Sequence, residues 1–150
     1  NLLSIISASD NPPLNWQTFK NDQMNLKFYY SEDFSVSFAG ENVVKLSNNA
    51  KDLDELTFLF YSKKLKDGEL IDDIGVSLPF VMDGISLGSQ QVQIPGFTAK
   101  VKTYATGEKT NLLFLLRHND QGFAIRVSPG NSRKATEFGT ILQSVRPLNP

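Results

Sequence analysis

The stretch NLLFLLRHNDQGFAIRV, residues 111–127, contains the pattern that decides the fold. After Asn111 the residues are apolar in succession rather than in alternation, so an extended segment here is apolar on both faces. The polar NDQG that follows is typical of a hairpin turn, with Gly122 suited to a positive φ, and FAIRV is expected to pair back. The segment therefore predicts an antiparallel hairpin whose first strand lies inside a sheet.

A second strand of the same kind is predicted at ELTFLFYS, residues 55–62. Phe58 and Phe60 lie on one face, and Leu59 and Tyr61 make the other face apolar as well. Two strands that are apolar on both faces need a layer of structure against each face of their sheet.

The stretch NWQTFKNDQMNLKFYYSEDFSV, residues 15–36, holds the only Trp and five further aromatic residues. From Met24 the apolar residues alternate with polar ones, which predicts a half-buried strand that is followed by shorter strands around residues 34–38 and 42–46. A sugar-stacking platform is the alternative for these rings. Because Phe28 and Tyr30 share the apolar face, we favour a core, with only Tyr29 as a candidate exposed ring.

The remaining segments predict a short helix near residues 70–74, strands at 85–94 and 97–106, and a C-terminal amphipathic helix. Asn131 or Ser132 is expected to cap that helix, and Pro147 to end it. Its apolar stripe is Ala135, Phe138, Ile141, Leu142 and Val145.

The predicted fold class is therefore α+β: an antiparallel β-sheet covered by helices on both faces, an α/β/α sandwich. Residues 1–15 are expected to be an extended segment or linker, and residues 16–150 a single domain. The side chains expected in the core are Phe28, Phe58, Phe60, Leu113, Phe114, Leu115, Ile125, Phe138, Ile141 and Leu142.

Composition restricts the function. The net charge of −1 argues against a nucleic-acid binder, and no apolar run is long enough to span a membrane. The chain has no Cys, which excludes disulfides and thiolate chemistry. Since the sequence starts at Asn1 without a complete signal peptide, the apolar patch at residues 2–6 is either an ordinary terminus or the remainder of a membrane tether upstream of Asn1.

No catalytic constellation is evident. His118 is the single His, and it is interpreted as a partly exposed residue beside a turn. The sequence contains no nucleophile elbow, zinc-protease motif or phosphate loop, and the carboxylates around Asp52 to Glu55 lack the Gly and the closing Glu of a calcium loop. The carboxylates at residues 67–73 are interpreted as solvated loop charge, and a paired-carboxylate glycosidase site is the open alternative. We therefore expect no catalytic residue, no metal and no cofactor. An enzyme would require a polar pocket that holds His118 within hydrogen-bond reach of a carboxylate.

Four segments resemble the PsbP-like domain family. Trp16 and Phe19 followed by the alternating MNLKFYY and then FSV resemble the start of that domain. The segments VQIPGFTAKVKTYA, LLFLLRHNDQGFAIRV and KATEFGTILQSVRPL resemble its later strands and its closing helix. The chain departs from the family pattern at Ser31, where the family has Pro, at Phe34, where it has Trp, and over residues 62–96.

The resemblance implies an α/β/α sandwich and a role without catalysis, often outside the cytoplasm. Family members include photosystem II extrinsic subunits, bacterial lipoproteins, secretion-effector chaperones and a Ran-binding factor. The expected function is a non-enzymatic extracytoplasmic binding or accessory domain that acts through protein–protein contacts. The alternative is a cytoplasmic chaperone or adaptor of the same fold that holds an apolar segment of a partner protein.

A partner is expected to bind at residues 79–96, with the acidic loop 67–73 beside them. The candidate residues are Phe80, Val81, Met82, Asp72 and Asp73. Phe and Met beside Pro and Gly suggest a surface turn, and exposed Phe and Met are frequent interface anchors. The alternative is that Phe80, Val81 and Met82 pack back onto the sheet edge.

Overall fold

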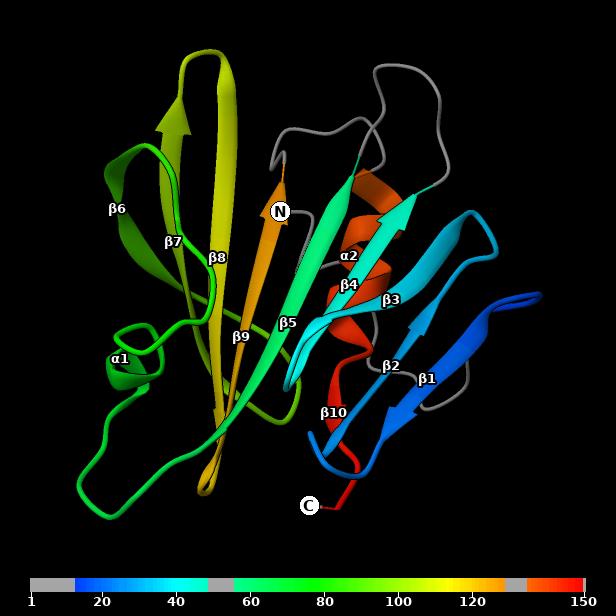
Figure 1. Cartoon of the computed structure of the whole chain (residues 1–150), viewed down its shortest axis with the longest axis horizontal. Helices are drawn as coiled ribbons and strands as arrows, with labels where there is room; N and C mark the ends of the chain where they lie inside the picture. Colours follow the sequence, from blue (N-terminus) through cyan, green and yellow to red (C-terminus); the bar gives the residue numbers. More distant parts are fainter. Residues whose placement is uncertain (1–12, 49–55, 129–134, 150) are drawn as a thin grey trace.

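The computed structural model describes residues 13–48, 56–128 and 135–149, which form two antiparallel sheets and two helices (Figure 1). The seven-stranded sheet has the order β3-β4-β5-β9-β8-β7-β6, and the three-stranded sheet has the order β1-β2-β10. The elements in chain order are β1 (Gln17–Asn21), β2 (Leu26–Tyr30), β3 (Phe34–Gly40), β4 (Val43–Asn48), β5 (Thr57–Lys64), α1 (Ile71–Ile74), β6 (Ile85–Val92), β7 (Thr98–Thr106), β8 (Lys109–His118), β9 (Gln121–Ser128), α2 (Ala135–Gln143) and β10 (Arg146–Pro147). The expected caps Asn131 and Ser132 and most of the expected linker 1–15 lie outside the described residues.

The two strands that are apolar on both faces lie in the interior of the large sheet, as predicted. β5 and β8 flank the central strand β9, and all their pairings are antiparallel. On β8, Phe114 and Leu116 join a large hydrophobic cluster on one side of the sheet. Leu113 and Leu115 join a smaller cluster on the other side. The sheet therefore has a hydrophobic core on each face.

The larger cluster, which we call the main core, contains all the predicted core residues except Leu113 and Leu115, which lie in the smaller cluster. Each of the ten is at most 5% exposed, so the core prediction is confirmed. Helix α2 packs on this face through Phe138, whose ring lies 6.0 Å from Phe58 and 5.9 Å from Phe114. The small sheet packs there too, because Phe28 stacks on Phe60 at 4.3 Å.

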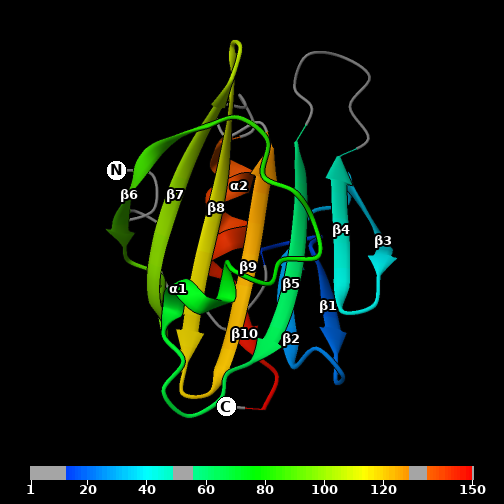
Figure 2. The same cartoon turned by 60° about the vertical axis from the view of Figure 1, so that its left-hand side comes forward.

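The opposite face is covered differently from the prediction. Its cover is the four-residue helix α1 and the irregular segment that follows it, as Figure 2 shows. The expected cover of helices on both faces is therefore not shown, because α1, a single turn, is the one helix among the described residues on this side. Gly75 ends α1 after one turn, Pro79 disfavours further helix, and Gly84 has a φ of 108° that only glycine adopts easily.

The hairpin between β8 and β9 also differs in detail. The residue with positive φ is Asn119, at 54°, rather than Gly122, and Asn tolerates this conformation better than most residues. Gly122 is required for another reason. A Cβ at Gly122 would lie 2.8 Å from Cδ1 of Ile74, so the missing side chain is what allows α1 to lie against the sheet.

Sequence reasoning was wrong about Tyr29 and missed β1. Tyr29 is only 5% exposed, and its backbone N–H donates a hydrogen bond to Ser144 Oγ, in the turn after α2, at 2.9 Å. β1 was not predicted, because its sequence QTFKN carries no apolar alternation. It forms a strand because β2 offers it a continuous pairing edge.

The main core gives a first prediction. Replacing Phe138 by Ala removes a ring that contacts both Phe58 and Phe114, so we expect a loss of roughly 3–5 kcal/mol in the free energy of unfolding. Urea denaturation measures this, with Val81→Ala, at a position 71% exposed, as a control that stays within about 0.5 kcal/mol. A Phe138→Ala effect as small as the control would show that α2 is not packed on the sheet.

The contact between Gly122 and Ile74 gives a second prediction. Gly122→Ala requires the Ile74 side chain to shift, so we expect a loss of roughly 1–3 kcal/mol in the free energy of unfolding and faster amide exchange across residues 71–75. Gly75→Ala is the matched control, because a Cβ there meets its neighbours only at ordinary distances of 3.5 Å or more. Equal exchange in both variants would contradict the proposed role of Gly122.

Candidate partner-binding surface and a polar pocket

Helix α1 is fixed to the sheet by one apolar residue and several carboxylates. Ile74 is fully buried over Gly122. At the start of the helix, the Asp73 carboxylate accepts a hydrogen bond from the Leu70 backbone N–H at 2.6 Å. One turn earlier, Glu69 accepts from the Lys66 N–H at 2.7 Å and pairs with Lys63 at 3.1 Å. Asp73, a predicted partner-binding residue, therefore also has a local structural role.

Asp72 connects α1 to β7. Its carboxylate lies 3.0 Å from Lys100 Nζ and 3.6 Å from Lys102 Nζ, two side chains on the same face of β7. The hydrogen bond from Lys100 lowers the pKa of Asp72 below its usual value of 3.8, and both ammonium charges add to this. A lowered folded-state pKa means that the stabilisation is complete above the unfolded value and is lost as the pH falls through the folded value. This ion pair is therefore intact at neutral pH, although Asp72 is 55% exposed and the pair is screened by solvent.

The predicted apolar anchors divide into two groups. Phe80 and Met82 are half-buried against the smaller cluster under α1, and the Arg126 guanidinium lies 5.7 Å from the centroid of the Phe80 ring. Arg126 also donates to the Val81 carbonyl oxygen at 3.3 Å. Val81 itself is 71% exposed. The structure thus places Phe80 and Met82 on the sheet face and leaves Val81 accessible to a partner.

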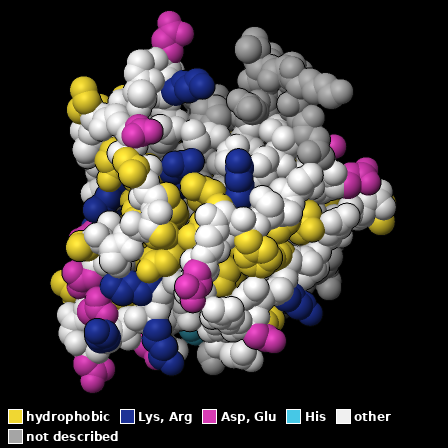
Figure 3. All heavy atoms as spheres, viewed as in Figure 1, with side chains coloured by type: hydrophobic (Ala, Val, Ile, Leu, Met, Phe, Trp, Pro, Cys, Tyr) yellow, Lys and Arg dark blue, Asp and Glu magenta, His cyan; other side chains and the backbone are white. Residues whose placement is uncertain are grey.

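Exposed apolar side chains are concentrated around this segment. Of the seven strongly exposed large hydrophobic residues in the described part of the chain, five lie between residues 70 and 87. They are Leu70, Val76, Val81, Ile85 and Leu87, and we call the region they mark the 70–87 surface. Figure 3, which has the same view as Figure 1, shows hydrophobic side chains interspersed with acidic and basic ones over the half of the molecule that contains α1 and β6.

The 70–87 surface continues onto an open strand edge. β6 is the last strand of the large sheet, it carries no charged residue, and nearly all of it is exposed. No strand among the described residues pairs with its outer side. Edge strands are usually protected by charge, Pro or covering elements, so an uncharged edge beside apolar side chains is suited to contact with another chain.

A polar pocket of about 570 Å³ lies at the turn of the β8–β9 hairpin, and sequence reasoning missed it. It is rich in carboxamides, and its lining residues are Gln23, Asn25, Asn42, Ser62, Lys64, His118, Asn119, Asp120, Gln121 and Asn149. These residues are spread from position 23 to position 149 with no motif spacing, so only the folded chain brings them together.

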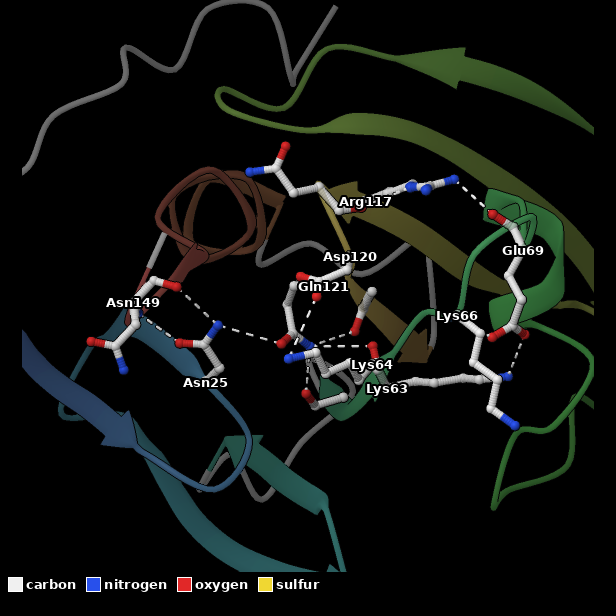
Figure 4. A network of polar contacts seen from close by, with 12 residues as sticks. Asn25, Lys63, Lys64, Lys66, Glu69, Arg117, Asp120, Gln121 and Asn149 are labelled. Carbon is white, nitrogen blue, oxygen red and sulfur yellow. Dashed lines mark hydrogen bonds and ion pairs between the residues drawn. The ribbon is translucent and has the colours of Figure 1, made fainter.

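Hydrogen bonds across this pocket connect the two sheets, as Figure 4 shows. Gln121 Nε2 donates to Ser62 Oγ at 2.8 Å, and Asn25 Nδ2 donates to Gln121 Oε1 at 3.3 Å. The Asn149 backbone N–H donates to Asn25 Oδ1 at 2.6 Å. The carboxamides thus fasten the turn before β2 and the segment after β10 to the central hairpin.

His118 lines this pocket without a carboxylate partner among the described residues. Its Nδ1 lies 2.9 Å from the Gly96 carbonyl oxygen, and the nearby Asp120 pairs instead with Lys64 at 3.4 Å. The described ranges contain no group of three or more His, Asp or Glu residues placed to hold a metal ion. They also contain no helix long and apolar enough to cross a membrane.

Comparison with solved structures identifies the same architecture elsewhere. The solution structure of cyanobacterial PsbP (CyanoP) from Synechocystis sp. PCC 6803 superposes with a TM-score of 0.62 at 11% identity, over 96% of this chain and 99% of that one. A crystal structure of a protein from Bacteroides thetaiotaomicron VPI-5482 superposes with a TM-score of 0.64 at 10% identity, over 89% of this chain. The match covers 49% of the Bacteroides protein, so this chain spans about half of its length.

No protein-family model matches the chain, and no curated protein sequence matches it either. The likeness is therefore one of structure, and at 10–11% identity it establishes the fold alone. The PsbP-like fold that the sequence patterns predicted is confirmed.

Proposed function

We propose that this chain is a non-enzymatic accessory domain that acts outside the cytoplasm and binds a protein partner through the 70–87 surface. The observation that carries the proposal is the concentration of exposed apolar side chains there, five of seven in the described part of the chain. The PsbP-like fold supports it, since the sequence resemblance to that family implies a role without catalysis.

The physical basis is the burial of apolar surface on binding. Each Å² of apolar surface removed from water contributes roughly 25 cal/mol, and a stable interface buries at least about 1,200 Å² in total. Val81, Ile85 and Leu87 are 64–74% exposed and lie on one continuous segment that leads into β6. They are therefore suited to be central contacts, while Asp72 and its lysine partners are suited to the polar rim.

The two half-buried anchors, Phe80 and Met82, give the surface a defined shape. Both are packed against the sheet, and Arg126 holds Phe80 and the Val81 carbonyl in place. A partner then meets Val81 in a fixed position and does not have to order a loose loop, which lowers the entropic cost of binding.

The alternative function, a cytoplasmic chaperone or adaptor, needs one continuous apolar patch for an extended apolar segment. Around α1 the exposed apolar residues alternate with the charged group of Asp72, Lys100 and Lys102. This mixture favours a specific accessory contact over a chaperone groove.

The partner surface gives a third prediction. A photo-crosslinking residue at position 81 is expected to capture one partner in the source cells, and Val81→Ser with Leu87→Ser is expected to abolish co-purification of that partner. Both side chains are exposed, so the unfolding midpoint is expected to stay unchanged. Leu14→Ser, at a position 89% exposed but outside the surface, is the matched control. Co-purification of the partner that survives the double substitution would refute this surface as the binding site.

Location gives a fourth prediction. Fractionation of source cells, followed by detection of the native protein, is expected to find it in the extracytoplasmic or membrane-associated fraction. Recovery in the cytoplasmic fraction alone would favour the chaperone or adaptor alternative, even if the 70–87 surface binds a protein.

A further inference from the structure

Three basic side chains lie in a row across the small sheet. Lys20 on β1 is the direct cross-strand partner of Lys27 on β2, and Lys27 is the partner of Arg146 on β10. Residues in direct register project from the same face of a sheet, and like charges placed opposite each other are unfavourable. Such a row is therefore expected only where something of opposite charge balances it.

The described residues do not supply that balance. None of the described carboxylates forms an ion pair with Lys20, Lys27 or Arg146. Lys27 lies over the ring of Tyr29, 5.4 Å from its centroid, which orients the ammonium group without neutralising it.

The row borders a pocket of about 320 Å³, which we call the basic pocket. Its lining residues are Lys20, Lys27, Gly96, His118, Arg146, Pro147 and Leu148, with no acidic residue among them. The pocket lies next to the polar pocket, because His118 lines both. It lies apart from the 70–87 surface, with which it shares no residue.

Two of the lining groups are held in place by the backbone. Arg146 Nη1 donates to the carbonyl oxygens of Gln143 and Val145, at 2.8 and 2.7 Å, which fixes the guanidinium at the end of α2. Its remaining N–H groups have no partner among the described residues and are available to an acceptor. His118 Nδ1 faces the Gly96 carbonyl oxygen, which can only accept a hydrogen bond, so Nδ1 carries a proton in this contact. The other ring nitrogen, Nε2, takes no part in it.

We propose that the basic pocket binds an oxyanion, a phosphate or carboxylate group. Two lysines and an arginine whose guanidinium is held at Nη1 line one small concave space, and such side chains form charge-assisted hydrogen bonds with oxyanions. A bound oxyanion relieves the repulsion along the row, so the pocket is more stable occupied than empty. Free phosphate-bearing or carboxylate-bearing molecules and the acidic side chains of another protein share this chemistry.

The test is a titration with inorganic phosphate at low ionic strength, followed by amide chemical shifts of the isotope-labelled protein. Saturable shifts are expected at the amides of residues 20, 27, 96, 118, 146 and 148, and not on the 70–87 surface. Lys20→Gln with Lys27→Gln is expected to weaken the affinity at least about tenfold, because it removes two charge-assisted contacts. Lys45→Gln with Lys109→Gln is the matched control, since it removes the same charge from two exposed positions elsewhere.

A second measurement separates loss of binding from loss of folding. In phosphate-free buffer the Lys20→Gln, Lys27→Gln variant is expected to unfold at a temperature equal to or above that of the unsubstituted protein, because two like charges are removed from the row. In phosphate, only the unsubstituted protein and the control variant are expected to gain thermal stability. Shifts that do not saturate, or that are equal in both double variants, would overturn the proposal.

A parallel titration with citrate and with an unstructured Glu-rich peptide distinguishes a small-molecule anion from an acidic protein segment. Tighter binding of phosphate or citrate than of the peptide identifies a small-molecule anion, and the reverse identifies an acidic protein segment. If none of the three probes perturbs the basic pocket, the proposal is wrong, whereas the proposed function at the 70–87 surface is unaffected.

Discussion

The stacking of Phe28 on Phe60, at 4.3 Å and nearly parallel, is the contact on which the rest of the structure depends. It holds the small sheet against the large one and continues through Phe58 to Phe138 of α2. Since aromatic rings bury large areas and pack in defined geometries, this chain of rings sets where α2 and the small sheet lie. The aromatic bulk of residues 15–36 is therefore explained by the packing of two sheets and not by a ligand site.

The opposite face of the large sheet is covered without a chain of aromatic rings. Its cluster is small, and a single helical turn is docked by the insertion of Ile74 over Gly122. The segment after α1 carries Pro and Gly and stays irregular, so its side chains point both toward the sheet and toward solvent. This division gives the 70–87 surface a rigid base under exposed apolar residues.

The sequence predicted the interior of the fold more completely than its periphery. β5 and β8 were identified because two-faced apolar strands can lie only inside a sheet, and the ten core residues followed from the same periodicity. β1 and β10 are short and polar, so their own sequences carry no strand pattern. They form strands because each pairs with β2. Gly122 was recognised as special, but for the turn, since the clash that demands glycine comes from Ile74, far away in the sequence.

The candidate sites, too, were predicted only where a local sequence pattern marks them. The segment around Val81 was found because apolar residues beside Pro and Gly are a local signal, yet the burial of Phe80 and Met82 depends on where the sheet lies. The polar and basic pockets had no local signal, because their residues come from both ends of the chain and from the central hairpin.

Charge distribution connects these sites. The N-terminal half of the sequence is acidic and the C-terminal half is basic, and the fold pairs them where they meet, as between Asp72 and Lys100. Such pairing accounts for Lys100 and Lys102 on β7, whose carboxylate partner is Asp72. It does not account for Lys20, Lys27 and Arg146, which the small sheet places side by side and which pair with no carboxylate in the described part of the chain. This row of cations, without an ion-pair partner among the described residues, is the feature on which the proposed oxyanion site rests.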